Sequence, residues 1–140
     1  INTDITYSFD GTNATGSHGD ATARAHADTK WTQEEIDDNE APEGADTDTV
    51  KVEGLKTILI KTIKAQAEGE LNKTDWYITR KSEKNTAIPS AITTHRDAVR
   101  SKQASMETAI TNASDTPALE TLYTRNDSGV RPLGDLPILE

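Results

Sequence analysis

The chain lacks cysteine and has few large apolar side chains. Of its 140 residues only 33% are hydrophobic and 4% aromatic, and 16 of the hydrophobic residues are alanine. The absence of cysteine excludes disulfides, thiol catalysis and cysteine-ligated zinc. Ordinary domains are about 45–50% apolar with glycine counted, so one large enclosed core is excluded as well. No apolar run approaches the ~18 residues of a membrane span, and we expect no membrane partner.

Positive charge is also scarce, and its distribution is uneven. The formal net charge is −9 at pH 7. Residues 1–50 hold 12 acids and 2 bases, residues 51–104 hold 6 acids and 11 bases, and residues 105–140 hold 6 acids and 2 bases. The three blocks therefore carry −10, +5 and −4. The acidic total disfavours nucleic-acid binding, and the division predicts an acidic arm attached to a mildly basic folded segment.

The N-terminal ten residues have the alternation of a β-strand. Ile5, Tyr7 and Phe9 alternate with polar residues, and Asp10-Gly11 is a turn signal. Because one strand cannot bury itself, we expect it to pair elsewhere in the chain or on a neighbouring molecule. Residues 11–29 are small and polar, which predicts loop or disorder, with a helical turn or two over 21–27.

A short helix and an acidic stretch follow. Thr32 and Glu35 match the reciprocal capping pattern that opens a helix, and Trp31 is placed to pack on Ile36. Eight of the fifteen residues from 34 to 48 are acidic and none is basic. We interpret this stretch as a solvated linker and place a domain boundary at its end.

Two long helices are predicted, over about 49–71 and 90–113. Residues 46–49 suit the start of the first helix, and Ser90 is a candidate cap for the second. The first carries an apolar stripe made of Val52, Leu55, Leu59, Ile60, Ile63, Ala67 and Leu71. The second carries Ile92, Val99, Met106 and Ala113 at intervals of seven, with Arg96, Gln103 and Ile110 four residues after the first three. This half-polar seam predicts packing along one partner helix, with Trp76 closing one end of the pair.

Shorter elements complete a mainly α fold. Thr74 or Asp75 can cap a short helix whose first turn contains Trp76 and Tyr77, and a polar turn follows over 81–87. Thr116 is the predicted cap of a last helix, with Pro117 as its first residue and an apolar side made of Leu119, Leu122 and Tyr123. The expected architecture is a small helical hairpin over 49–124, an arm and linker over 1–48 and an extended tail over 125–140.

No catalytic, cofactor or metal site is predicted. We interpret His18 and His26 as solvated loop residues, and His95 as a surface histidine on a helix. The acidic stretch lacks the ligand spacing of a calcium loop. The scattered basic residues indicate either a solvated face or a surface for an acidic protein segment: Lys56, Lys61, Lys64, Arg80, Lys81, Lys84, Arg96, Arg100 and Lys102. Trp76 and Tyr77 are expected to anchor a small core, with an exposed interface as the alternative.

Part of the chain resembles a known phage family. The run 71–80 (LNKTDWYITR), then Ala87-Ile88-Pro89 and the run 95–100 (HRDAVR), is similar to the small tail-assembly chaperone and tail-fibre-assembly-like module of tailed phages. The resemblance covers about residues 52–124, extends to Asp115-Thr116-Pro117 as in marine phage virion proteins, and is most specific at Thr74-Asp75-Trp76. The acidic, threonine-rich arm departs from the family pattern.

The resemblance implies a non-catalytic virion structural protein of the tail, baseplate or neck. The alternative is a transient tail or tail-fibre assembly chaperone that is absent from the mature virion. The expected partners are other phage structural proteins and copies of this chain, bound in a particle assembled in the host cytoplasm, with no nucleic acid, small-molecule substrate or cofactor. The expected partner-binding residues are Ile5, Tyr7, Phe9, Trp31, Trp76, Tyr77, Leu136, Ile138 and Leu139.

Overall fold

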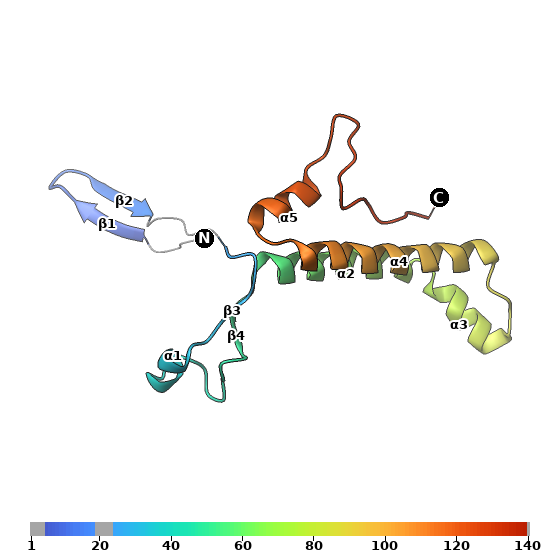
Figure 1. Cartoon of the computed structure of the whole chain (residues 1–140), viewed down its shortest axis with the longest axis horizontal. Helices are drawn as coiled ribbons and strands as arrows, with labels where there is room; N and C mark the ends of the chain where they lie inside the picture. Colours follow the sequence, from blue (N-terminus) through green and yellow to red (C-terminus); the bar gives the residue numbers. More distant parts are fainter. Residues whose placement is uncertain (1–4, 19–23, 140) are drawn as a thin grey trace.

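Two long antiparallel helices form the body of the protein (Figure 1). The computed structural model describes residues 5–18 and 24–139. The elements are β1 (Ile5–Phe9), β2 (Ala14–His18), β3 (Thr29–Lys30), α1 (Gln33–Asp37), β4 (Val50–Val52), α2 (Leu55–Asn72), α3 (Asp75–Lys84), α4 (Ser90–Asn112) and α5 (Thr116–Tyr123). The predicted mainly α class is confirmed. None of the helices in the described ranges is long and apolar enough to cross a membrane.

The packing of α2 against α4 follows the predicted seam. The buried residues of α4 are Ile92, Arg96, Val99, Met106 and Ile110, and Ala113 follows them at the helix end. On α2, Ile63 and Ala67 are buried, while Leu55, Leu59 and Ile60 pack partly buried against the core. Because residues seven and four apart share one side of a helix, this narrow line faces α2, and most of the other α4 residues are exposed.

Helix α2 begins at Leu55, six residues later than predicted. Residues 50–52 form β4 instead, antiparallel to β3, and Val52 is 46% exposed. The segment before β3 supplies the missing helix cap: the carbonyls of Ala25 and His26 accept from the backbone N–H groups of Leu55 and Lys56 at 2.9 and 3.0 Å. Asp28 accepts from the Gly54 N–H at 2.7 Å. The first N–H groups of a helix need such partners, so this contact fixes where α2 starts.

Residues 29–53, here named the acidic lobe, form a small unit of β3, α1 and β4 rather than a solvated linker. The predicted capping box is confirmed, since Thr32 and Glu35 exchange backbone and side-chain hydrogen bonds at the start of α1. Lys51 ties the lobe together because its Nζ lies 2.5 Å from Glu35 Oε1 and 4.5 Å from the centre of the Trp31 ring. The β3–β4 pairing therefore joins residues on both sides of position 48.

The C-terminal tail folds back on the helices. Leu133 is 3% exposed in the same core cluster as Leu119, and its N–H donates to the Leu122 carbonyl at 3.0 Å. Helix α5 is capped by Asp115, which accepts from the Ala118 N–H at 2.8 Å, so the predicted cap Thr116 is the first helical residue.

Two further boundaries differ from the prediction. Helix α3 continues to Lys84, into the predicted polar turn. At the start of α4 the cap position is Pro89, and Ser90 is the first helical residue without a capping bond.

An N-terminal hairpin extends away from the helices (Figure 1). The predicted strand is β1, and it pairs antiparallel with β2, so the loop expected over residues 14–18 is wrong. Small residues such as Ala14 and Gly16 give this strand no apolar alternation, which hid it in the sequence. Of the helical turns expected over 21–27, residues 21–23 lie outside the described residues, and residues 24–27 are not helical.

Candidate functional site

The hairpin presents two aromatic side chains to solvent. Tyr7 is 74% and Phe9 71% exposed. Across the ladder Tyr7 lies opposite Gly16, and Phe9 lies opposite Ala14. Because directly opposed residues share a face, the two rings lie on one face of the hairpin, and their cross-strand neighbours are too small to cover them. We name Tyr7 and Phe9 the hairpin surface; the side chain of Ile5, the third predicted residue, lies outside the description.

The hairpin turn is ordered by its own hydrogen bonds. The Asp10 carboxylate accepts from the N–H groups of Thr12 and Asn13 at 2.9 and 2.8 Å. The bonds from Asn13 and Thr12 hold the pKa of Asp10 below its usual value. Gly11 has φ of +95°, a conformation that favours glycine. The turn therefore specifies the hairpin locally and presents its two aromatic rings at a fixed spacing.

Helix α3 carries a second exposed aromatic group. The rings of Trp76 and Tyr77 lie 3.8 Å apart, and the Arg80 guanidinium lies 4.8 and 5.5 Å from their centres. Trp76 is 51% exposed and Ile78 43% exposed. The expectation that Trp76 closes the core is therefore wrong, because its ring lies on the surface with a cation above it. Tyr77, the other ring of this group, is half-buried.

The core at this end is closed by Arg96 instead. Its Nη1 lies 2.8 Å from the Leu71 carbonyl, 2.7 Å from Thr74 Oγ1 and 2.8 Å from Asp75 Oδ1. Arg96 is 8% and Thr74 0% exposed. One guanidinium thus joins the C-terminal end of α2 to the start of α3 from its position on α4. The prediction of a solvated Arg96 is wrong; the half-polar seam was the signal, since it placed an arginine among core positions.

Two nitrogens near this end are buried without a hydrogen-bond partner among the described residues, His95 Nε2 and Arg80 Nε. His95 is half-buried, so the expectation of a surface histidine holds for only part of its ring. His26 is half-buried, and the side chain of His18 is not described. Within residues 5–18 and 24–139 no group of three or more histidine and acidic side chains is placed to hold a metal ion.

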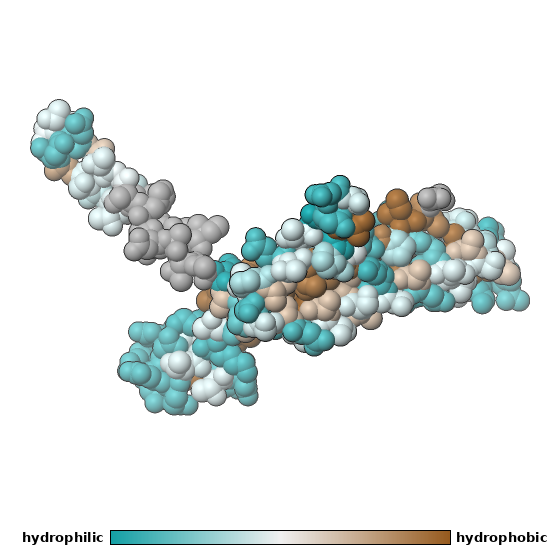
Figure 2. Space-filling view, turned by 45° about the horizontal axis from the view of Figure 1, so that its top comes forward, coloured by the Kyte–Doolittle hydropathy of each residue, from teal (hydrophilic) through white to brown (hydrophobic). Residues whose placement is uncertain are grey.

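The end of the tail is apolar and partly uncovered. Leu136 packs against the core cluster, whereas Ile138 is 70% and Leu139 39% exposed. Figure 2 shows brown atoms along this tail above the long helices. Of the three residues expected to bind a partner here, Leu136 is therefore largely used within the chain. Trp31 is likewise half-buried, under Lys51.

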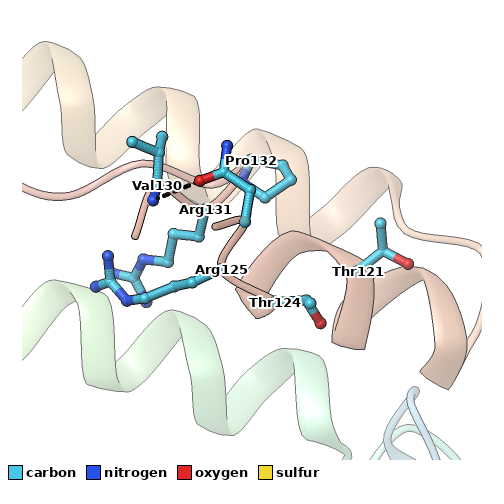
Figure 3. A pocket seen from close by; sticks show the side chains of 7 residues that line it. Thr121, Thr124, Arg125, Val130, Arg131 and Pro132 are labelled. Carbon is cyan, nitrogen blue, oxygen red and sulfur yellow. Dashed lines mark hydrogen bonds between the residues drawn. The ribbon is translucent and has the colours of Figure 1, made fainter. Parts of the chain in front are cut away.

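A pocket of about 350 Å³ lies between α5 and the tail (Figure 3). Its lining is Thr121, Thr124, Arg125, Asn126, Val130, Arg131 and Pro132. Arg125 and Arg131 both bind Asp135, with nitrogen–oxygen distances of 3.1 and 2.8 Å, and Arg125 foremost lowers the pKa of this carboxyl. The lining holds no histidine, lysine or carboxylate that could act as a general base. We therefore regard the pocket as a consequence of the tail's fold.

No protein-family model matches the chain, and no curated protein and no solved structure matches it either.

Proposed function

We propose that the chain is a non-catalytic bacteriophage virion structural protein that docks on neighbouring subunits through its hairpin surface. The observation that carries this proposal is the exposure of Tyr7 and Phe9 on a projecting two-stranded hairpin. An isolated two-stranded hairpin is at best marginally stable in water. A docked partner would supply the apolar cover that the described residues do not give to these two rings.

The two exposed rings of the hairpin surface would supply a substantial apolar contribution to docking. Aromatic side chains bury about 150–250 Å² each. Covering the exposed seven-tenths of Tyr7 and Phe9 would contribute roughly 5–9 kcal/mol at about 25 cal/mol per Å², before the costs of association. Among the described residues β2 pairs only with β1, so its outer edge adds backbone donors and acceptors for a partner strand. Both contributions favour binding to protein over catalysis.

The assignment to a phage particle rests on the resemblance around Thr74-Asp75-Trp76. The structure adds a physical reason for this motif: Thr74 and Asp75 bind the buried Arg96, while Trp76 remains exposed. The motif therefore combines a structural part with a side chain free to bind a partner. The tail, baseplate and neck are the expected locations within the particle.

Mass spectrometry of purified particles tests the proposal. We expect the unmodified chain in particles, and we expect the double variant Tyr7→Ala, Phe9→Ala to be incorporated at least about tenfold less, since each 1.4 kcal/mol is a factor of ten. Ser8→Ala with Thr15→Ala is the matched control, because these residues pair at 3.3 Å on the opposite face of the same hairpin. A chain found in infected-cell lysate but never in particles would refute the proposal.

An assembly chaperone is the second candidate, favoured by one feature. The acidic lobe holds 9 acids and 2 bases, and such charge keeps a complex with an apolar partner soluble. Absence from particles, together with rescue of an aggregating fibre protein on co-expression, would favour this function.

A further inference from the structure

Helix α3 carries three cations that lie outside the ion pairs of the described residues. Arg80, Lys81 and Lys84 form no ion pair with any residue in the described ranges, although nine other pairs occur there. Together with Trp76 and Tyr77 they occupy less than half of the helix circumference, at about 100° per residue. We name these five residues the α3 surface. A half-exposed indole beside a tyrosine and an arginine is a composition typical of a binding surface, and the two lysines add positive charge at its edge.

The acidic lobe carries the opposite imbalance. Residues 37–43, here named the acidic turn, contain Asp37, Asp38, Glu40 and Glu43, and none of these pairs with a cation of the described residues. The turn is ordered by backbone hydrogen bonds, including Asp38 to Glu34 and Glu40 to Glu35, both 2.9 Å. Its carboxylates are therefore presented from a defined backbone, and all four residues are exposed.

The two surfaces cannot meet within one molecule. In Figure 1 the lobe with α1 and β4 lies at one end of the long helices, and α3 lies at the other end. The 18 residues of α2 between them span about 27 Å at 1.5 Å per residue. At physiological ionic strength the Debye length is about 8 Å, so the charges barely interact across this distance. The two surfaces therefore do not neutralise each other within one molecule.

We propose that the acidic turn of one copy of this chain docks on the α3 surface of the next copy. In this arrangement Asp37, Asp38, Glu40 and Glu43 face the three unpaired cations. Pro42, exposed between two of these acids, covers the indole of Trp76. The contact is head-to-tail, so repetition yields a ring if it closes and a filament if it does not. The inference rests on the proposed function in one respect: it takes another copy of this chain to be one of the subunits on which the chain docks.

Sedimentation of the purified full-length chain tests the contact first without any variant. We expect a weight-average mass of at least about twice that of one chain at about 0.01 M salt. We expect the monomer mass at about 1 M salt, because the Debye length falls from about 30 Å to about 3 Å. A monomer at both salt concentrations, at the highest soluble protein concentration, would overturn the inference.

Charge reversal then assigns the contact to these residues. The variants Lys81→Glu with Lys84→Glu and Asp38→Lys with Glu40→Lys and Glu43→Lys place like charges on both surfaces, so each alone is expected to be monomeric at low salt. Mixed in equal amounts, every acidic surface again meets a basic one, and the mixture is expected to regain the mass of the unmodified chain. Circular dichroism of each variant checks that α3 and the lobe remain folded.

The matched control is Lys64→Glu with Arg100→Glu. These residues lie on α2 and α4 outside both surfaces, with side chains that are 57% and 53% exposed in ion pairs of 3.6 and 3.4 Å. The variant has the same net charge as Lys81→Glu with Lys84→Glu. We expect it to associate as the unmodified chain does. A mixture that stays monomeric, or a control as defective as the surface variants, would overturn the inference. The proposed function would then stand or fall separately, by incorporation of the hairpin variants.

Discussion

Replacing Arg96 by methionine should destabilise the protein far more than the same change one turn along the helix. Methionine keeps the aliphatic stem and has a helix propensity close to that of arginine, so the change removes little beyond the guanidinium. The lost interactions are the bonds of Nη1 to the Leu71 carbonyl, Thr74 Oγ1 and Asp75. The Asp75 carboxylate is 53% exposed, and a pair of this kind contributes about 0–1 kcal/mol.

The rest of the stability loss is limited, because the atoms that accept hydrogen bonds from Arg96 keep other hydrogen bonds. The Leu71 carbonyl keeps bonds from the Thr74 N–H at 3.0 Å and the Thr74 hydroxyl at 2.9 Å, so neither acceptor is left without a partner. A hydrogen bond to a charged group contributes about 1.5–3 kcal/mol, and all three bonds of Arg96 share one donor nitrogen, which weakens each of them. We therefore expect a loss of about 2–4 kcal/mol in the free energy of unfolding.

Urea unfolding followed by circular dichroism measures this loss, with Arg100→Met as the matched control. Arg100 is 53% exposed and meets Asp97 only at 3.4 Å, so its replacement should cost less than about 0.5 kcal/mol. A double-mutant cycle with Thr74→Val should give a coupling energy above about 0.5 kcal/mol. Equal losses for the Arg96 and Arg100 variants would refute the view that Arg96 closes the core at this end.

Three further predictions concern the ends of the molecule. Gly54→Ala should destabilise the protein by about 1–3 kcal/mol or more, because the new Cβ would lie 2.7 Å from the Asp28 backbone nitrogen. Gly69→Ala is the matched control: its Cβ would meet open space, so it should stabilise the protein by about 0.5–1 kcal/mol. Urea titration measures both changes. Hydrogen bonds from Lys51 and the Thr32 backbone lower the pKa of Glu35 from 4.5 to about 2. A carboxyl whose pKa is lowered in the folded state stabilises the fold above its unfolded pKa, so the lobe should lose stability as the pH falls from 4.5 toward 2. The Trp31 indole signal in NMR spectra should report this loss in the unmodified chain but not in Glu35→Gln. Leu133→Ala should cost about 2–5 kcal/mol and Ile138→Ala less than about 0.5 kcal/mol by thermal unfolding, since Leu133 is 3% and Ile138 70% exposed.

The helical pair was predictable because both helices carry a strong periodic signal. The interval of seven from Ile92 to Ala113 identified the buried side of α4, including the polar positions within it. The same pattern could have shown that Arg96 is buried, since a position between Ile92 and Val99 on one seam faces the partner helix. General burial preferences pointed the other way, because arginine is seldom fully buried without partners. The partners, Thr74 and Asp75, come from a turn whose geometry the sequence does not reveal.

The fold of the lobe and the place where the extended tail docks could not be predicted, because both depend on contacts between distant segments. The capping signal of Thr32 and Glu35 is local, and it was identified correctly. Strand β4 depends on β3 some twenty residues earlier, and residues 49–54 also fit the start of a helix. Leu133 enters the core only because the chain reverses after Tyr123. Non-local contacts of this kind leave no periodic signature in a single sequence.

The candidate binding residues divide according to how much the chain itself uses them. Leu136, Tyr77 and Trp31 are partly covered within the molecule, whereas the hairpin surface and Trp76 are not. These uncovered aromatics lie on β1, beside the turn that Asp10 orders, and at the start of α3, where Asp75 binds Arg96 of α4. Exposure of a large ring on a fixed element has no benefit for the isolated fold, because covering it would add stability. The proposed binding to other chains would account for both positions by one physical cause, and the opposed charges of the acidic turn and the α3 surface would give one of these contacts a direction.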